Sequence, residues 1–457
     1  MQMGENTMLY RKIESFIRNH LESKNNKILL IEGARQIGKT YIIRKVSKEL
    51  FPNYIEINFV TDAAGAKIFE NVRSVEDFYF ALSTVAGDKM KDRDSTIVFL
   101  DEIQEYPQFI TLLKFLREDN RFEYIASGSL LGVTLAETTS IPIGSVLHKR
   151  MFQLDFEEFL IANGFSQSAI DSLEEKFRSK TSLDEAMHEK MLDLFKKYLI
   201  VGGLPDCVNT FISTRNVMDI RQIQTDITNF YKADASKRDE ERKLKIRRIY
   251  EMLPSVMQNV KKRIVVKDIE GIKGKRYSNY DDEFDYLINS GITNEVKSVS
   301  TPVYPLCQSQ DKNLLKLYMN DVGLLSNLLF RYNTKPILET VRSINLGALY
   351  ETVVASELKA LGHSLFYYDN RNNGEVDFLI DDYENLAVLP IEVKSGRDYT
   401  VHSAIDKFLN NPDYPVKRGV VLSNDREIRD VGKITYYPIY FAMFFRSTSD
   451  YGKDMIL

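Results

Sequence analysis

The chain has 457 residues, of which 44% are hydrophobic and 28% are charged, and its formal net charge is −4. This length exceeds what one hydrophobic core supports, and it predicts about three or four domains of an ordinary globular protein. The slight acidic balance excludes a nucleic-acid coat over the whole molecule, although it leaves room for local basic faces.

The sequence predicts a protein of the cytoplasm. No apolar run approaches the roughly 18 residues that cross a bilayer, and the N-terminus has no basic start followed by an apolar stretch, so we expect no membrane partner. The two cysteines, Cys207 and Cys307, form no C-x-x-C pair. We therefore expect neither a disulfide nor a zinc site, but two inert core thiols in a reducing compartment.

An amphipathic helix is predicted over residues 10–23, and the segment ILLIEGARQIGKTY follows it over residues 28–41. This segment fits the pattern G-x-x-x-x-G-K-[ST], with a strand-like run before the loop and a helix-like run after it. The loop N–H groups would hold phosphates, Lys39 would reach the β- and γ-phosphate oxygens, and the Thr40 hydroxyl would bind Mg²⁺. A glycine-rich turn that precedes a lysine by chance is the alternative. We predict ATP contacts at Gly33, Ala34, Arg35, Gln36, Ile37, Gly38, Lys39, Thr40 and Tyr41.

A second strand is predicted over residues 54–59, and a third strand-like run, TIVFLD, ends at Asp101 and is followed by Glu102. The C-terminal ends of parallel strands meet at the sheet edge where phosphates bind, so both carboxylates are expected beside the glycine loop. Asp101 would hold Mg²⁺, mostly through water, and Glu102 would polarise the attacking water. A strand that ends in a solvated turn is the alternative for this segment. The glycine loop about sixty residues earlier favours the first reading, because a phosphate-binding loop needs a carboxylate that binds Mg²⁺.

The next predicted strand, FEYIASGS, ends in Ser127 and Ser129. These hydroxyls would contact the γ-phosphate or orient water; alternatively, they turn the chain or cap a helix at Leu130. Arg150 follows, and we expect it to precede another alternating strand. A cation at this place would serve as a finger or sensor arginine that stabilises transition-state charge, and a surface cation is the alternative.

Several of these segments together resemble the prokaryotic AAA-like ATPases of the additional-strand P-loop class. In that family an N-terminal ATPase is fused to a C-terminal domain of unknown function. The resemblance spans nearly the whole chain. The segments that carry it are GARQIGKT (33–40), LDEIQ (100–104), SGS (127–129), FEEF (156–159), VGGLP (201–205) and YMNDVGL (318–324).

Two departures from the family pattern surround Arg150. The letters QLD at 153–155 stand where the family usually has a proline, and His148 and Lys149 stand where its members tend to have a glycine. The resemblance implies an α/β fold, with a P-loop NTPase parallel sheet over residues 1–161 and a helical lid over residues 162–235.

Residues 237–276 are basic, with fourteen Lys or Arg against six Asp or Glu, on a chain that is acidic overall. A capped helix, SNYDDEFDYLINSG over residues 278–291, and two short strands follow. A basic helix, a second helix and a β-ribbon together predict a winged-helix module over residues 236–335, which the resemblance supports. The second helix is acidic, which disfavours direct reading of DNA by that helix, and the basic run also fits a solvated face.

The last segment, residues 336–457, carries a second constellation of charged residues. An amphipathic helix contains Glu351, and two strand-like runs contain Asp377 and the pair Glu392 and Lys394, which project to one face of an extended strand. The three carboxylates would surround a divalent cation, and Lys394 would position or activate water. This order resembles the PD-(D/E)xK nuclease fold, in particular its Holliday-junction-resolvase-like branch, and implies an α/β restriction-endonuclease-like domain. A degenerate fold used for binding is the alternative.

The leading hypothesis is a Mg²⁺-dependent ATPase with ATP and ADP as ligands, whose nucleotide state controls the winged-helix and nuclease-like modules and which acts on DNA. The alternative is a signal-transducing switch ATPase that binds a protein partner or a second copy of itself and cuts nothing. A nuclease with a vestigial P-loop is disfavoured, because Lys39, Thr40, Asp101 and Glu102 are all in place.

Overall fold

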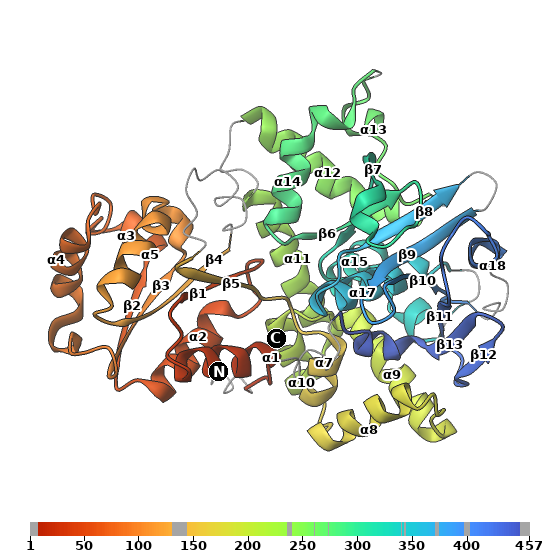
Figure 1. Cartoon of the computed structure of the whole chain (residues 1–457), viewed down its shortest axis with the longest axis horizontal. Coiled ribbons are helices and arrows are strands. Elements are labelled where there is room, and N and C mark those ends of the chain that lie inside the picture. Colours follow the sequence, from red (N-terminus) through yellow and green to blue (C-terminus); the bar gives the residue numbers. More distant parts are fainter. Residues whose placement is uncertain are drawn as a thin grey trace. The chain divides into compact units, whose positions relative to one another are not determined.

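The structure is a computed structural model that describes residues 8–129, 144–234, 240–259, 261–272, 274–339, 341, 344–370, 374–396 and 403–447. The chain divides into two compact units, of which one is Met8–Gln153 and the other holds most of the chain from Leu154 onward. Each unit is built around its own β-sheet (Figure 1). Leu130, where the alternative role of Ser127 and Ser129 would start a helix, lies outside the described residues. Among the helices of the described part, none is long and apolar enough to cross a membrane.

The first unit contains a five-stranded sheet in which every strand runs parallel to its neighbours, in the order β2-β3-β4-β1-β5. One strand, β4, lies between β1, which leads into the glycine loop, and β3, which ends at Asp101. The elements are α1 (Lys12–Glu22), β1 (Ile28–Glu32), α2 (Lys39–Leu50), β2 (Asn53–Asn58), α3 (Phe59–Ala64), α4 (Val75–Ala86), β3 (Thr96–Asp101), α5 (Gln108–Asp119), β4 (Glu123–Gly128) and β5 (Val146–Arg150).

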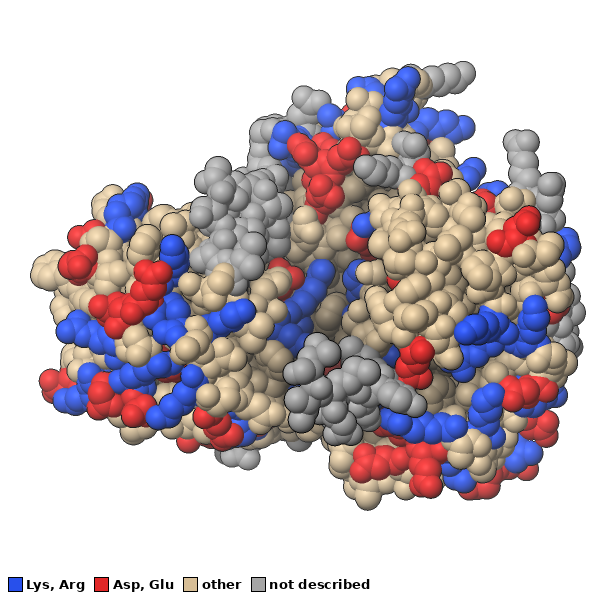
Figure 2. Space-filling view, in the orientation of Figure 1, with Lys and Arg blue, Asp and Glu red and all other residues tan. Residues whose placement is uncertain are grey.

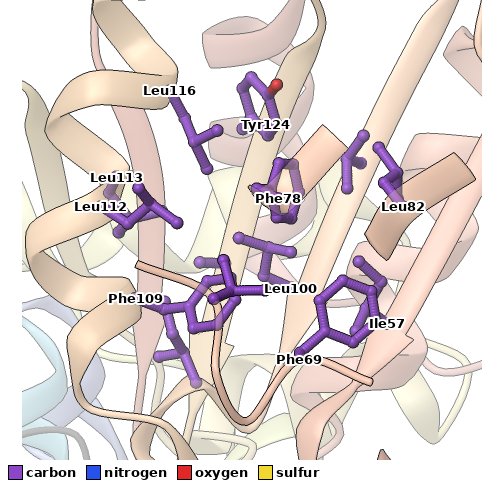
Figure 3. Close-up of a cluster of buried hydrophobic side chains, with 14 of the residues drawn as sticks. Ile57, Phe69, Phe78, Leu82, Leu100, Phe109, Leu112, Leu113, Leu116 and Tyr124 are labelled. Atoms are coloured by element: carbon purple, nitrogen blue, oxygen red, sulfur yellow. The ribbon is translucent and has the colours of Figure 1, made fainter. Parts of the chain in front are cut away.

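The central strands of this sheet, β1, β3 and β4, are buried along their whole length, as expected for parallel strands that helices cover on both faces. Alternate side chains, such as Leu30, Val98 and Leu100, join a buried cluster with α4 and α5 (Figure 3). Phe78 and Phe109 are fully buried in this cluster. The intervening side chains point to the opposite face, and α2 packs against β3 and β4. The packing therefore fixes the strand ends, from which the candidate site is built.

The segment after Arg150 is a helix and not the alternating strand that we expected. Strand β5 ends at Arg150, and α7 spans Phe156–Ala162. Asp155 and Glu158 form a capping box: the Glu158 N–H donates to the Asp155 carboxylate at 2.9 Å, and the Asp155 N–H donates to the Glu158 carboxylate at 3.3 Å. The D-x-x-E signal was missed because it lies inside a run of alternating apolar residues.

The second unit combines helices with an eight-stranded mixed sheet. Its helices are α7, α8 (Gln167–Arg178), α9 (Glu185–Val201), α10 (Pro205–Thr214), α11 (Val217–Asp234), α12 (Glu240–Gln258), α13 (Lys267–Glu270), α14 (Asp281–Asn289), α15 (Val322–Phe330), α16 (Lys335–Leu338), α17 (Gly347–Ala360) and α18 (Ser403–Leu409). Its strands are β6 (Thr293–Val299), β7 (Gln310–Met319), β8 (Phe366–Asn370), β9 (Gly374–Asp382), β10 (Ala387–Val393), β11 (Gly419–Ser423), β12 (Arg429–Val431) and β13 (Ile434–Pro438).

The eight strands lie in the order β12-β13-β11-β10-β9-β8-β6-β7. Strands β6 and β7 form an antiparallel pair, and β6 runs parallel to β8. The β-ribbon that we assigned to a winged-helix module is thus continuous with the strands that carry Asp377 and Glu392. The boundary at residue 335 separates strands of one sheet, and the division into a winged-helix and a nuclease-like part stays a prediction. Helix α17 packs against β6, β7 and β10, and α18 packs against β9.

The motifs VGGLP and YMNDVGL pack against each other. Asp321 caps α15 by accepting from the Leu324 N–H at 3.1 Å, and its second oxygen accepts from the Gly203 N–H at 2.7 Å. A Cβ at Gly202 would lie 2.2 Å from an Asp321 oxygen, and a Cβ at Gly323 would lie 2.6 Å from the Val201 carbonyl oxygen. The Asp321 carboxylate beside Gly202 and the backbone beside Gly323 leave no room for a side chain, so both glycines have a structural role.

One of the two cysteines departs from the expectation of a core thiol. Cys207 is buried in α10, but Cys307 is exposed. Cys307 lies in the short 3-10 turn Leu306–Ser309, in which Leu306 is the buried residue. Leu306 takes the inward position of this single turn, and Cys307, the next residue, faces outward.

Candidate functional site

The glycine loop joins β1 to α2 and has the backbone geometry of a phosphate-binding loop. Gly38 precedes α2 with φ 90° and ψ 20°, a left-handed conformation that favours glycine. A Cβ at Gly33 would lie 2.3 Å from the Met151 carbonyl oxygen, so only glycine fits there. The first N–H groups of α2 have no partner within the helix and can bind an anion.

Lys39, at the start of α2, is buried beneath this loop. Its Nζ donates to the carbonyl oxygens of Gly33 at 2.9 Å and Ala34 at 2.8 Å. Burial lowers the pKa of Lys39 to about 8, although the charges of Glu102 and Asp101 partly offset this effect. Within the described residues, no carboxylate forms an ion pair with Lys39. A buried cation held by carbonyl oxygens alone is prepared to receive an anion.

Asp101, at the end of β3, collects hydroxyl and amide donors from three other elements. One carboxylate oxygen accepts from the Thr40 hydroxyl at 3.0 Å and from the Asn58 amide at 3.1 Å, and the other accepts from the Ser127 hydroxyl. Burial raises the pKa of Asp101 and the charge of Glu102 adds to this rise, whereas the Ser127 hydrogen bond acts against it. A carboxylate beside a threonine hydroxyl is an oxygen donor set that fits Mg²⁺.

Glu102 follows in a left-handed backbone conformation, with φ 55° and ψ 47°, which is strained for a residue other than glycine. Its Oε2 accepts from the Gln104 amide at 2.5 Å and from the Ser129 hydroxyl at 2.9 Å. Burial acts to raise the pKa of Glu102, but the Gln104 hydrogen bond, the charge of Lys39 and the Ser129 hydrogen bond outweigh it, and the pKa is lowered. The carboxylate is therefore ionised and held in one orientation.

Arg150 lies at the carboxyl edge of the same sheet. It pairs in register with Glu32, the last residue of β1, and its Nε lies 3.9 Å from Glu32 Oε1. His148 Nε2 lies 3.0 Å from the other Glu32 oxygen. The Arg150 guanidinium also lies 5.6 Å from the centre of the Phe152 ring. Its assignment as a finger or sensor arginine stays a prediction.

Most of the residues predicted for this site thus meet at one edge of the sheet. The contacts join Thr40 and Ser127 to Asp101, and Ser129 to Glu102. The side chain of Tyr41, by contrast, is 50% exposed. The assignment of each residue to the nucleotide stays a prediction. Sequence reading missed Asn58 and Gln104, although Asn58 is a polar residue at the end of the strand next to β3 and carried a usable signal.

In the second unit, Glu351 on α17 is buried with both carboxylate oxygens engaged. Lys262 Nζ lies 2.7 Å from Glu351 Oε1, and the Tyr318 hydroxyl donates to Oε2 at 2.9 Å. Burial raises the pKa of Glu351, as does the charge of Asp377, whereas Lys262 and Lys316 act in the opposite direction. Sequence reading did not connect either lysine with this carboxylate.

The other predicted ligands lie on the neighbouring strands β9 and β10. One oxygen of Asp377 accepts from the Val393 N–H at 2.8 Å, and Lys394 Nζ lies 2.7 Å from Glu392 Oε1. The second oxygen of Glu392 is buried and has no hydrogen-bond partner. Burial and the charge of Asp377 raise the pKa of Glu392 to about 8, although Lys394 partly offsets the rise. Asp377 lies close to Glu392 because β9 and β10 are neighbouring antiparallel strands in which Ile391 pairs with Phe378.

Glu351, Asp377 and Glu392, together with the nearby Glu375, form what we call the acidic cluster. Its carboxylates do not offer a three-carboxylate metal site in this arrangement. Within the described residues, no group of three or more His, Cys, Asp or Glu side chains is arranged to hold a metal ion. Glu351 has no free oxygen, because Lys262 and Tyr318 occupy both. The assignment of Glu351, Asp377 and Glu392 as metal ligands stays a prediction.

Comparison with protein families divides the chain in three. Residues 25–160 match a family model described as an AAA domain. Residues 192–335 and 346–441 match two models described as domains of unknown function, DUF8612 and DUF4143 respectively. The first match supports the prediction of an AAA-like ATPase, and the other two agree with the predicted fusion to a part of unknown function. A comparison with curated proteins gives no match.

Among solved structures, the chain is similar to the Walker-type ATPase of Pyrococcus abyssi, at 12% identity and TM-score 0.44 over 70% of this chain and 96% of that chain. The Aeropyrum pernix ORC1 protein in complex with DNA is similar at 14% identity and TM-score 0.30, over 74% and 95% of the two chains. The RuvB Holliday junction branch migration motor of Thermotoga maritima is similar at 11% identity and TM-score 0.29, over 62% and 89%. Likenesses this weak say nothing about what the present chain binds.

Proposed function

We propose that the first unit binds ATP together with Mg²⁺ and hydrolyses it. The observation that carries the proposal is the convergence of Thr40 and Ser127 on Asp101, beside a buried Lys39 that, among the described residues, donates to two carbonyl oxygens and to no carboxylate. The match of residues 25–160 to an AAA domain supports it.

In the proposed mechanism the loop N–H groups and Lys39 bind the β- and γ-phosphates, and Lys39 exchanges its two carbonyl contacts for phosphate oxygens. Thr40 and Asp101 would hold Mg²⁺, which neutralises phosphate charge when bound. Glu102 takes a proton from the attacking water, and Gln104 and Ser129 keep its carboxylate ionised and oriented until then.

Glu102→Gln tests this assignment. The variant is expected to retain ATP binding and to lose hydrolysis by a factor on the order of 10² or more, because it removes the base but not the binding loop. Lys39→Ala is expected to lose ATP binding itself. Phosphate release and binding of a fluorescent ATP analogue would be measured for both, with the exposed Glu76→Gln on α4 as a matched control. Equal loss of binding in both site variants would contradict a base role for Glu102.

We further propose that the second unit transmits the nucleotide state to a partner molecule. The charged side chains on its surface indicate what kind of partner this is. Arg242 lies 2.9 Å from Asp282, and Arg247 lies 3.0 Å from Glu251. On the face drawn in Figure 2, Lys and Arg residues stand among Asp and Glu residues. Because paired cations release fewer counterions on a phosphate backbone, this pattern favours a protein partner over DNA.

Action on DNA remains the competing proposal, and one assay separates the two. ATP turnover would be measured with duplex, single-stranded and branched DNA, together with cleavage of the same DNA in Mn²⁺. Stimulation by DNA that falls steeply with salt would support DNA as the partner. Turnover that no nucleic acid changes, together with absence of cleavage, would support the protein-binding switch.

A further inference from the structure

The acidic cluster of the second unit already contains a cation, which is the ammonium group of Lys262. Its Nζ lies 2.7 Å from Glu351 Oε1, and the two side chains are only 13% and 4% exposed. The Tyr318 hydroxyl occupies the other Glu351 oxygen at 2.9 Å. We propose that Lys262 takes the place of a divalent cation at this cluster, so that a metal ion enters only after Lys262 has withdrawn.

Lys262 is held in this position by its neighbours in the chain. Lys261 Nζ lies 2.8 Å from one Asp369 oxygen, and an Arg263 guanidinium nitrogen lies 3.7 Å from the same oxygen. The Ile264 N–H then donates to the Leu315 carbonyl oxygen at 3.0 Å, on the edge strand β7. A segment of three consecutive cations is therefore fixed along the sheet, with only the middle one turned into the cluster.

Two other carboxylates of the cluster pair with lysines, and a third accepts from the backbone. Lys394 pairs with one oxygen of Glu392, and Lys316 pairs with Glu375. Asp377 accepts from a backbone N–H, and its charge acts on both Glu351 and Glu392. The internal lysines thus supply the counter-charge that a metal would otherwise supply.

One carboxylate oxygen of the cluster is available to a metal ion, and this oxygen indicates what the cluster would bind without Lys262. The second oxygen of Glu392 is buried and has no hydrogen-bond partner. Withdrawal of Lys262 would free Glu351 Oε1 as well, beside Asp377. Carboxylate oxygens of this kind suit a hard divalent cation such as Mg²⁺ or Mn²⁺. The Lys261–Arg263 segment therefore acts as a cover on a latent cation site. All of these residues belong to the second unit, so the proposal does not depend on ATP hydrolysis.

Thermal unfolding of the full chain without nucleotide tests the proposal. The wild type is expected to melt at the same temperature in chelator and in MnCl₂. Lys262→Met is expected to melt roughly 5 °C lower in chelator, because Glu351 loses its counter-charge, and to regain this loss in a saturable manner with MnCl₂. Lys180→Met is the matched control and should behave as the wild type does, because Lys180 is an exposed lysine of the same unit that pairs with Asp430 at 2.8 Å, outside the cluster.

A double variant keeps the proposal testable even where Lys262→Met fails to fold. Lys262→Met with Glu351→Gln removes both charges of the pair, so it should melt near the wild type and show no response to MnCl₂. Electron paramagnetic resonance of Mn²⁺ gives an independent reading of the wild type. A bound Mn²⁺ in the wild type that Glu392→Gln removes would overturn the proposal. So would a Lys262→Met variant that does not respond to Mn²⁺, or a double variant that fails to fold.

Discussion

The two units bury lysine side chains in opposite ways. In the first unit, Lys39 donates to the carbonyl oxygens of Gly33 and Ala34, and it pairs with no carboxylate in the part of the chain that the structure describes. In the second unit, Lys262 and Lys316 each form an ion pair with a carboxylate. A buried charge is costly unless it is paired. The unpaired lysine is therefore where a ligand is expected, and the paired lysines stabilise the fold without one.

Lys39→Met should give the largest effect, on ATP turnover. Loss of the cation at the phosphates should lower turnover by a factor on the order of 10² or more, as loss of one transition-state donor does. The nucleotide-free variant should nevertheless melt no lower than the wild type, because it no longer buries a charge. Since the pKa of Lys39 is lowered to about 8, this relief is present below pH 8 and fades as pH rises toward 10.5.

Differential scanning calorimetry and a phosphate-release assay would check both parts, with Lys24→Met as the control. Lys24 is an exposed lysine that pairs with Asp94 at 2.7 Å. A large drop in the melting temperature of nucleotide-free Lys39→Met would show that Lys39 stabilises the fold, and the contrast between the two units would then be lost.

The first site was largely predictable from the sequence because its parts are local. Glycines, Lys39 and Thr40 lie in one loop, and a strand delivers Asp101 to its own end whatever the rest of the fold does. The second site was not, because Lys262 lies 89 residues before the carboxylate that it pairs with. Periodicity predicted that Glu392 and Lys394 share a face, but no local pattern indicates which distant cation will fill an acidic cluster.

Lys316→Met tests the second half of the comparison, that the paired lysines stabilise the fold. Lys316 is fully buried on β7, and its removal takes away the cation that pairs with Glu375. Breaking a buried pair in this way is expected to cost about 3 to 5 kcal/mol of the free energy of unfolding, with the lower figure nearer here because Glu375 keeps some contact with water. Lys297→Met on β6 is the control, since Lys297 and Glu295 are both partly exposed and their pair should be worth about 1 kcal/mol or less. Urea unfolding would measure both, and equal effects would remove the distinction.

Asp321 lies between these two cases, because backbone N–H groups satisfy its buried carboxylate and no cation of the described residues pairs with it. Burial raises the pKa of Asp321 to about 6, against the lowering effect of the Gly203 and Leu324 N–H groups. The protonated form is thus favoured by the folded state. The stability of the wild type should fall relative to Asp321→Asn as pH rises from about 4 to 6, by about 2 to 3 kcal/mol, and stay level above that. The free energy of unfolding of both proteins would be measured at several pH values. Any loss of stability from the substitution that does not depend on pH then cancels in the difference. A difference that stays constant with pH would contradict the prediction.

The smallest predicted effect concerns the orientation of Glu102 in the nucleotide site. The Gln104 amide and the Ser129 hydroxyl both donate to Glu102 Oε2 and lower its pKa, Gln104 more than Ser129. Removing either donor should therefore raise the pKa of Glu102, and the acidic limb of the pH profile of kcat/KM, which reports the free enzyme, should move to higher pH. Gln104→Ala is expected to move it further than Ser129→Ala, and the exposed Ser83→Ala should leave it unchanged. A loss of rate at every pH without a shift of the limb would mean that the two donors only position the carboxylate. A shift in the stated order would show that the same hydrogen bonds also set how readily Glu102 accepts a proton.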